Sequence, residues 1–214
     1  MHFNIADWIV RIPVLLFCIT IHEYAHGRVA YALGDPTAKM AGRLTLNPFR
    51  HLDPIGAIML FLFNFGWAKP VPINPRYFKD IKRNTILMAA AGPAANLFVA
   101  FVAGFLIRHL LFASKLYQLV LLYLLFMNIG LALFNLIPIP PLDGSHILEN
   151  LLSYEMSIKY QRIGRYGLMI LFLVVLLDSF AGTQILTSIL LYPMFWLAKL
   201  FAGKNLMWLM NNLE

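Results

Sequence analysis

The chain has 214 residues, of which 60% are hydrophobic and 13% are charged. A soluble domain is about half apolar and about a quarter charged, so this composition excludes an ordinary soluble protein. It predicts an all-α integral membrane protein in which residues 1–214 form one membrane-embedded domain. The net charge of +7 is not taken as a sign of a nucleic-acid partner, because basic residues also gather beside membrane spans.

The apolar runs predict about five transmembrane helices, since about 20 apolar residues cross a bilayer. They cover residues 8–33, 85–111, 116–138, 167–180 and 184–201. Residues 8–150 form the expected core of the domain, and two further helices within 163–202 complete it.

The distribution of Lys and Arg predicts the orientation in the cell membrane. Most of these residues lie in residues 34–84, in residues 159–165 and at the C-terminal end, whereas Arg11, Arg108 and Lys115 lie at the other ends of the spans. By the positive-inside rule, the N-terminus is expected outside and the C-terminus in the cytoplasm.

The first apolar run contains the motif His22-Glu23-Tyr24-Ala25-His26. Two histidines four residues apart lie on one helical face, so both can bind a single Zn²⁺, and the glutamate between them is the usual general base. Ionisable groups cost about 2.5–3.5 kcal/mol each within a membrane run, which favours a function for them. The alternative, two chance histidines on a packed helix, leaves Glu23 unexplained.

The connection after the first span contains two unusual segments. Residues 55–67 are apolar but too short to cross, which predicts a re-entrant or interfacial piece. Residues 69–75 contain three prolines, which favour extended backbone. Two interpretations of this Pro-rich segment remain open, a surface loop that touches lipid and a β-like strand that pairs with an extended substrate.

The next two spans carry further polar residues. Small residues at 91–95 predict close helix packing, and a secondary interpretation places Asn96 toward the active site. The third span ends in a Pro-rich break that leads to Asp143. A catalytic zinc commonly has three protein ligands, and Asp143 is the best candidate for the third. The charge distribution places it on the same, cytoplasmic side as the histidines. The alternative for Asp143 is a helix cap.

Together these motifs resemble the site-2 protease family of intramembrane zinc metalloproteases. The resemblance covers residues 15–150 and rests on three elements. They are His22-Glu23-x-x-His26, Gly92-Pro93-x-x-Asn96, and Asn135-x-x-Pro138-x-Pro140-x-Leu142-Asp143-Gly144. The chain is similar to a compact form of the family without PDZ or CBS domains.

The resemblance implies one Zn²⁺ per chain, bound by His22, His26 and Asp143. It implies Glu23 as the catalytic base and Asn135 as a residue that positions the substrate or the oxyanion. It also implies a membrane protein substrate, cut in or near a transmembrane segment at a site open to the cytoplasm, in regulated intramembrane proteolysis.

Two rival functions remain, a metal hydrolase that acts on a non-protein substrate and a membrane protein that binds or transports metal. A transporter typically spreads acidic residues along several spans, whereas here they concentrate at Glu23 and Asp143. Cys18, His51 and His146 are expected to pack or to support the site rather than to bind the metal. The oligomeric state, the substrate and its route of entry are not predicted.

Overall fold

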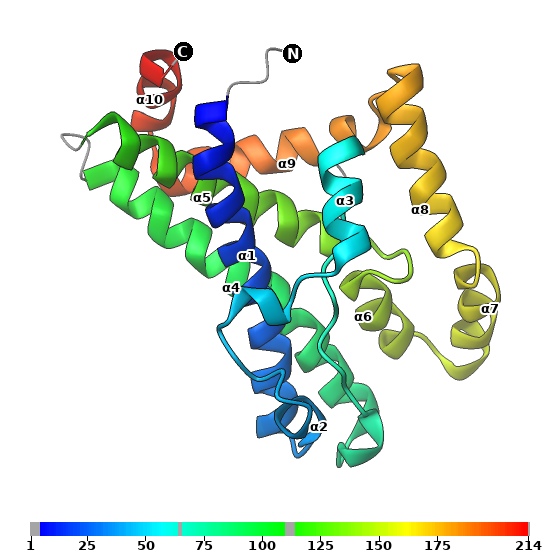
Figure 1. The fold of residues 1–214 in the computed structure, drawn as a ribbon. Coiled ribbons are helices and arrows are strands. Elements are labelled where there is room, and N and C mark those ends of the chain that lie inside the picture. The colour runs from blue at the N-terminus through cyan, green and yellow to red at the C-terminus, as the bar shows by residue number, and fades with distance from the viewer. Residues whose placement is uncertain (1–4, 64–65, 110–113, 214) are drawn as a thin grey trace.

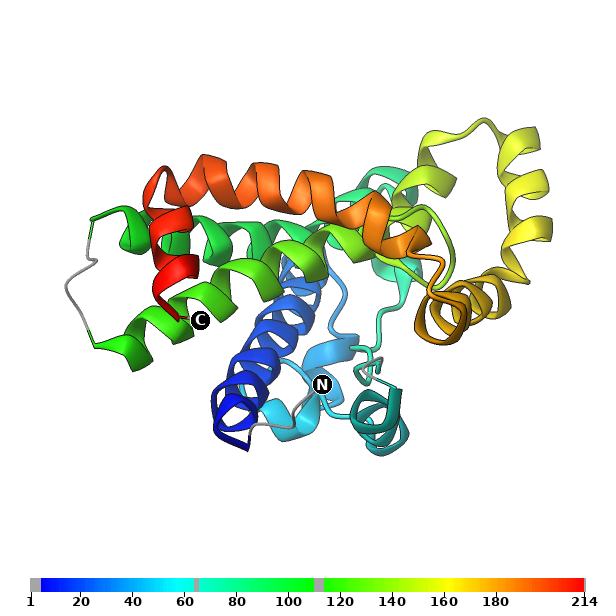
Figure 2. The same cartoon turned by 90° about the horizontal axis from the view of Figure 1, so that it is seen from above.

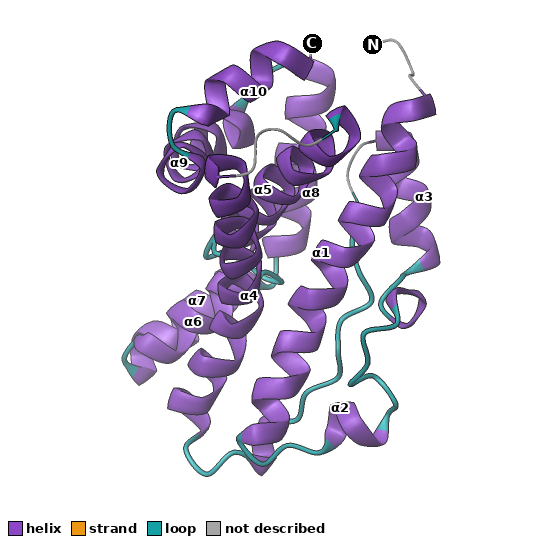
Figure 3. Ribbon diagram, turned by 90° about the vertical axis from the view of Figure 1, so that its left-hand side faces the viewer, coloured by secondary structure: helices purple, strands orange, loops and turns teal. Residues whose placement is uncertain are grey.

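The computed structural model describes residues 5–63, 66–109 and 114–213. Within these residues the regular elements are helices, and Figure 3 shows them joined by loops, with no strand in the part of the chain that is described. The all-helical architecture expected from the composition is therefore confirmed.

Three helices are long and apolar enough to cross a membrane. They are α1 (Ile5–Ala32), α4 (Ile81–His109) and α5 (Lys115–Asn135), and they correspond to the first three predicted spans. Ser114 is the N-cap of α5, and its side chain accepts a hydrogen bond from the Tyr117 N–H. Figure 1 shows α1 crossing in front of α4 and α5.

Helix α4 is the central element and packs against α1, α5 and α9. Small buried residues such as Ala100 and Ala103 let its neighbours approach closely. At one end of the bundle, Ile107, Leu125 and Leu206 belong to a single apolar cluster. In the view of Figure 2, α4, α5 and α9 run side by side.

The connection from α1 to α4 contains α2 (Thr37–Met40), α3 (Pro54–Phe63) and two 3₁₀ turns, Pro48–Arg50 and Pro75–Tyr77. The chain returns beside its own path after α3. There the Lys69 N–H donates to the His51 carbonyl at 3.0 Å, and Leu52 pairs with Ala68 in an isolated antiparallel bridge. The expected β-like character is limited to this bridge within the described residues.

After α5 the chain forms five further helical pieces. They are α6 (Asp143–Leu151), α7 (Tyr154–Gly164), α8 (Gly167–Leu176) with a π-helical extension (Leu177–Ala181), α9 (Ile185–Ala202) and α10 (Asn205–Leu213). The predicted fourth and fifth spans correspond to α8 with its extension and to α9. Both α8 and α9 are shorter than the three long helices.

Helices α8 and α9 both begin near the loop that follows α5. A β-carbon built on Gly167 would lie 2.3 Å from the Pro140 carbonyl oxygen, so the start of α8 touches this loop. An apolar pocket is lined by Ile137 from the loop, Val174 from α8 and Ile185 from α9, among others. The chain therefore enters α9 at the same end of α5 at which it entered α8.

The far end of α9 lies beside the end of α4. Arg108 Nη2 donates to the Leu200 carbonyl at 2.8 Å, and Asn205 Nδ2 donates to the Arg108 carbonyl at 2.9 Å. The structure thus places the end of α9 beside Arg108, whereas the distribution of basic residues predicted the two on opposite sides of the membrane. The apolar runs alone predicted that α8 and α9 cross the membrane one after the other. In the structure, α8 starts and α9 starts near the same end of α5, so α8 does not carry the chain to the other end.

Candidate metal centre

His22 and His26 lie one turn apart on the face of α1 that meets α4. Both side chains are buried, and their Nε2 atoms are 3.0 Å apart. This spacing follows from the i, i+4 geometry of the helix, as the motif predicted.

Asp143, the first residue of α6, lies against the two histidines. Its Oδ2 atom is 3.1 Å from His22 Nε2 and 3.3 Å from His26 Nε2. The chain doubles back tightly after α5 and brings Gly144 against the Leu136 carbonyl. A β-carbon on Gly144 would lie only 2.2 Å from that carbonyl oxygen, so the turn requires glycine. The tertiary fold thus joins His22, His26 and Asp143, which are distant in sequence, into one cluster of candidate metal ligands.

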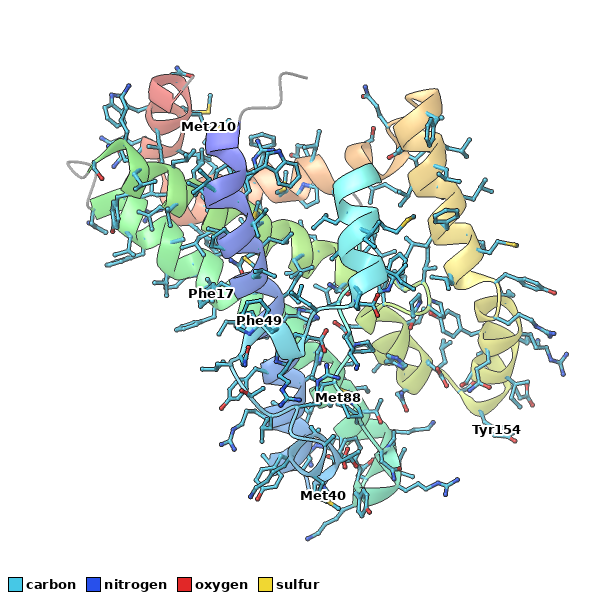
Figure 4. All side chains as sticks on the ribbon, viewed as in Figure 1. Phe17, Met40, Phe49, Met88, Tyr154 and Met210 are labelled. Carbon is cyan, nitrogen blue, oxygen red and sulfur yellow. The ribbon has the colours of Figure 1, made fainter. Side chains whose placement is uncertain are left out.

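The hydrogen bonds of the imidazoles determine which ring nitrogens face this cluster. His26 Nδ1 lies 2.8 Å from the Met88 carbonyl, which can only accept, so Nδ1 carries the proton (Met88 is labelled in Figure 4). His22 Nδ1 lies 2.6 Å from Asn96 Oδ1, which likewise accepts. In the neutral rings, both Nε2 atoms therefore direct lone pairs toward Asp143.

His22 Nε2, His26 Nε2 and Asp143 Oδ2 thus bring three lone pairs together with no proton between them. Such atoms repel each other unless a cation lies among them. Among the described residues, no hydrogen-bond donor is assigned to the buried Asp143 Oδ2. Tetrahedral zinc with ligand distances of about 2.0–2.1 Å separates its ligand atoms by about 3.3 Å, so the residues present fit this ion.

Gly92 on α4 makes room for this arrangement. A β-carbon at this position would lie 2.3 Å from His26 Nε2 and 2.7 Å from His22 Nε2. Asn96, one turn further along α4, is fully buried and contacts His22. The small-residue stretch of the second span therefore supports the cluster as well as helix packing, and Asn96 faces the site.

Glu23 lies between the two histidines in sequence and is tied to the Pro-rich segment. Its Oε2 accepts a hydrogen bond from the Val71 N–H at 2.9 Å. The same segment is held by Arg43, whose Nη2 donates to the Lys69 carbonyl at 2.7 Å, and by the Asn74 N–H, which donates to Asp35 Oδ2 at 2.7 Å. Three of the four peptide N–H groups of residues 69–75 are thus bonded within the protein.

Among the described residues, no hydrogen bond links Asn135 to the cluster. It is the last residue of α5, and its side-chain N–H donates to the Leu131 carbonyl of the same helix at 2.9 Å. His51 is buried and bonds to the Thr45 carbonyl, which is a structural contact as expected. His146 lies on α6, and its peptide carbonyl accepts a hydrogen bond from the side chain of Asn150.

The sequence interpretation did not single out Asn128, a buried polar residue in the middle of α5. Its Oδ1 accepts from Asn96 Nδ2 at 2.7 Å, and its Nδ2 lies 3.0 Å from Cys18 Sγ. The signal that identifies it is an amide inside a long apolar run, where a polar side chain requires a partner.

The fold and the cluster together are those of a membrane protein with a candidate metal centre, and comparison with known proteins specifies its class. The family model of Peptidase family M50 matches residues 111–177. A protein of Bacillus subtilis (strain 168) named "Putative zinc metalloprotease YwhC" is 41% identical over 189 residues, which are 84% of this chain and 83% of that protein.

Two mycobacterial proteins named "Putative zinc metalloprotease Rip2" are each 28% identical to this chain. The match to the protein of Mycolicibacterium smegmatis covers 71% of this chain and 60% of the relative, and the match to that of Mycobacterium tuberculosis (strain H37Rv) covers 83% and 68%. No solved structure matches the chain.

The chain belongs to peptidase family M50, the site-2 protease family. It is a multi-pass intramembrane zinc metalloprotease that acts on membrane substrates. This membership decides against the rival functions of metal transport and of hydrolysis of a non-protein substrate.

Proposed function

We propose that His22, His26 and Asp143 hold the zinc ion and that Glu23 is the general base that cuts peptide bonds in or near transmembrane helices. The observation that carries this proposal is the approach of His22 Nε2, His26 Nε2 and Asp143 Oδ2 to within 3.0–3.3 Å of one another. Two of these atoms come from α1 and one from α6, and their lone pairs point at a common centre.

Zinc bound here supplies Lewis acidity, which makes water a competent nucleophile near neutral pH. Glu23 takes the proton of the attacking water and returns it to the leaving amide nitrogen. The Val71 N–H holds one carboxylate oxygen of Glu23, so the base has a defined direction before the substrate binds. Asn135 keeps one side-chain N–H on the Leu131 carbonyl, and its second N–H is the donor offered to a substrate carbonyl.

A helical substrate must unwind before it is cut, because its carbonyl groups are bonded within the helix. The Pro-rich segment 69–75 runs past Glu23 and is the candidate for receiving the unwound strand. Most of its peptide N–H groups are already bonded within the protein, so it offers carbonyl groups rather than a full strand edge. A substrate strand would therefore donate its own N–H groups to this segment.

The contacts between helix ends suggest a revised topology, in which α1, α4, α5 and α9 cross the membrane. Residues 34–84 hold the largest group of basic residues, so this side is the cytoplasm and the metal centre opens toward it. The start of α1 and the end of α9 then both lie outside. The bridge between Leu52 and Ala68 holds the chain before α3 beside the chain that follows it, which supports a re-entrant piece that enters and leaves on one side.

The role of Glu23 is tested with the Glu23→Gln variant in membranes that contain a cleavable membrane protein. This variant should keep one zinc per chain and lose cleavage, whereas His22→Ala and Asp143→Ala should lose both. Glu155→Gln, on the exposed surface of α7, is the matched control and should cleave at the native rate.

Full zinc content in the His22→Ala and Asp143→Ala variants would refute the ligand assignment. Membrane proteins that accumulate with Glu23→Gln, and not with the native enzyme, would identify substrates. If their cleaved forms release signalling domains, the enzyme acts in regulated intramembrane proteolysis.

A further inference from the structure

We infer that Asn128 is a positioning residue for the metal centre, which acts through Asn96 on the proton of His22. The inference rests on the proposed assignment of His22 as a zinc ligand. Asn128 lies on α5, Asn96 on α4 and His22 on α1, so three membrane helices meet in one hydrogen-bonded chain. Asn96 and Asn128 have no exposed surface, and His22 is 5% exposed.

The first link is the bond between Asn96 Oδ1 and His22 Nδ1 at 2.6 Å. A histidine that binds a metal through Nε2 needs its proton on Nδ1, and this proton needs an acceptor. The amide oxygen of Asn96 is that acceptor. If the Asn96 amide were turned by 180°, its N–H would face Nδ1 and favour the tautomer whose Nε2 carries the proton and cannot bind zinc.

The second link holds the Asn96 amide in the required direction. Asn96 Nδ2 donates to the Cys18 carbonyl at 3.1 Å and to Asn128 Oδ1 at 2.7 Å, so both of its protons are bonded. A turned amide would place Oδ1 against two other oxygen atoms. Cys18 provides a backbone carbonyl that can only accept, and Asn128 provides the second acceptor.

The third link fixes Asn128 in turn. Asn128 Nδ2 donates to the Leu124 carbonyl at 2.8 Å and to Cys18 Sγ at 3.0 Å. The Leu124 carbonyl accepts only, so Nδ2 must face it and Oδ1 must face Asn96. The direction of each amide is therefore determined by backbone carbonyls, which can only accept.

This arrangement gives Asn128 a role that apolar packing cannot supply. Replacement of Asn128 by Leu would leave one Asn96 proton without an acceptor in a site that water does not reach, which weakens the preference for the required amide direction. Removal of residues that orient metal-binding histidines costs about 10–100-fold in metal affinity. Asn128 should act only while Asn96 is present, because it does not touch the imidazole.

The test measures the zinc dissociation constant of the purified full-length protein in detergent by competition with a chromophoric chelator. The variants are Asn96→Leu, Asn128→Leu and the double variant, with Gln118→Leu as the matched control. Gln118 is also a buried amide on α5, but it lies near the start of that helix. We expect each single substitution at 96 or 128 to raise the zinc Kd about 10–100-fold.

We expect the double variant to bind zinc no more weakly than Asn96→Leu alone, and Gln118→Leu to bind as tightly as the native protein. Multiplied effects in the double variant, or an Asn128→Leu affinity within about twofold of native, would overturn the inference. An equal loss in Gln118→Leu would also overturn it, because the effect would then be general destabilisation.

Asn128→Ser provides a second variant in case Asn128→Leu does not fold. A serine hydroxyl can bond to the Leu124 carbonyl four residues back and does not reach Asn96. It should weaken zinc binding as Asn128→Leu does, and native affinity in this variant would overturn the inference. His22→Ala separates the two proposals, because native zinc binding there would refute the ligand assignment itself.

Discussion

The Val71 N–H donates to Glu23 Oε2 at 2.9 Å, which ties the Pro-rich segment to the glutamate of the zinc-binding motif. One oxygen of Glu23 is thereby fixed by backbone that is itself stiffened by the prolines at positions 70 and 72. This proposed base is thus oriented by a segment outside its own helix.

Replacement of Val71 by Pro removes this N–H and should lower the turnover number by about 10-fold or more, while zinc content stays at one per chain. Val71→Ala is the control, because it keeps the N–H and removes only the buried side chain. Turnover and zinc content are measured on the same preparations. Equal turnover in the two variants would assign the effect to lost packing and contradict a role for the N–H.

Gly92→Ala should abolish zinc binding without unfolding the protein. The added methyl group would lie 2.3 Å from His26 Nε2, and the imidazole must move away from the cluster to admit it. Gly130→Ala on α5 is the control, since the nearest atom to its new methyl group is Met194 Sδ at 3.8 Å. Metal analysis and helical circular dichroism of both variants check this prediction. A zinc-loaded Gly92→Ala protein would contradict the geometry of the site.

Zinc should stabilise the native protein against heat, and Asp143→Asn should remove this effect. A ligand that binds only the folded state contributes about 2.7 kcal/mol at a free concentration of 100 times its Kd. The neutral amide of Asp143→Asn is a poor zinc ligand, so the variant retains only two histidines. Unfolding midpoints with and without zinc measure the difference. An equal zinc-induced shift in both proteins would rule out Asp143 as a ligand.

Single cysteines placed at exposed positions test on which side each helix end lies. Ser114→Cys and Lys204→Cys should react with a membrane-impermeant maleimide from the same side, because the start of α5 and the end of α9 lie together at the end of α4. Met40→Cys, beyond the other end of α1, should react from the opposite side. Right-side-out vesicles expose one face of the membrane to the maleimide, and inside-out vesicles expose the other. The native Cys18 is buried, so it should not contribute to the labelling.

Reaction of Lys204→Cys from the side of Met40→Cys would contradict the contacts between Arg108 and α9. It would instead support the orientation that the positions of the basic residues predicted.

The first three membrane helices and the three candidate ligands followed from the sequence because each depends on a local pattern. An apolar run of about 20 residues must form a helix in lipid, where the backbone has no other hydrogen-bond partners. The i, i+4 spacing of His22 and His26 places them on one face of that helix. Asp143 was found because two histidines leave a catalytic zinc in need of a third protein ligand and because the resemblance to a known family pointed to it.

The path of residues 167–202 did not follow from the sequence, because α8 and α9 have the same apolar character whether they cross successively or fold back. Only the contacts of Gly167 with Pro140 and of Arg108 with Leu200 determine where these helices begin and end. Asn128 was missed for a related reason. Its partners are 32 and 110 residues away, and no local pattern indicates which span supplies them.

The sequence by itself thus indicated the class of this protease, since the candidate zinc ligands, the proposed base and the apolar spans follow from local motifs. The tertiary structure alone decided how that chemistry is held. The direction of Glu23, the proton of His22 and the side on which α9 ends depend on hydrogen bonds between segments far apart in the chain. Such bonds form only when packing has brought the helices together.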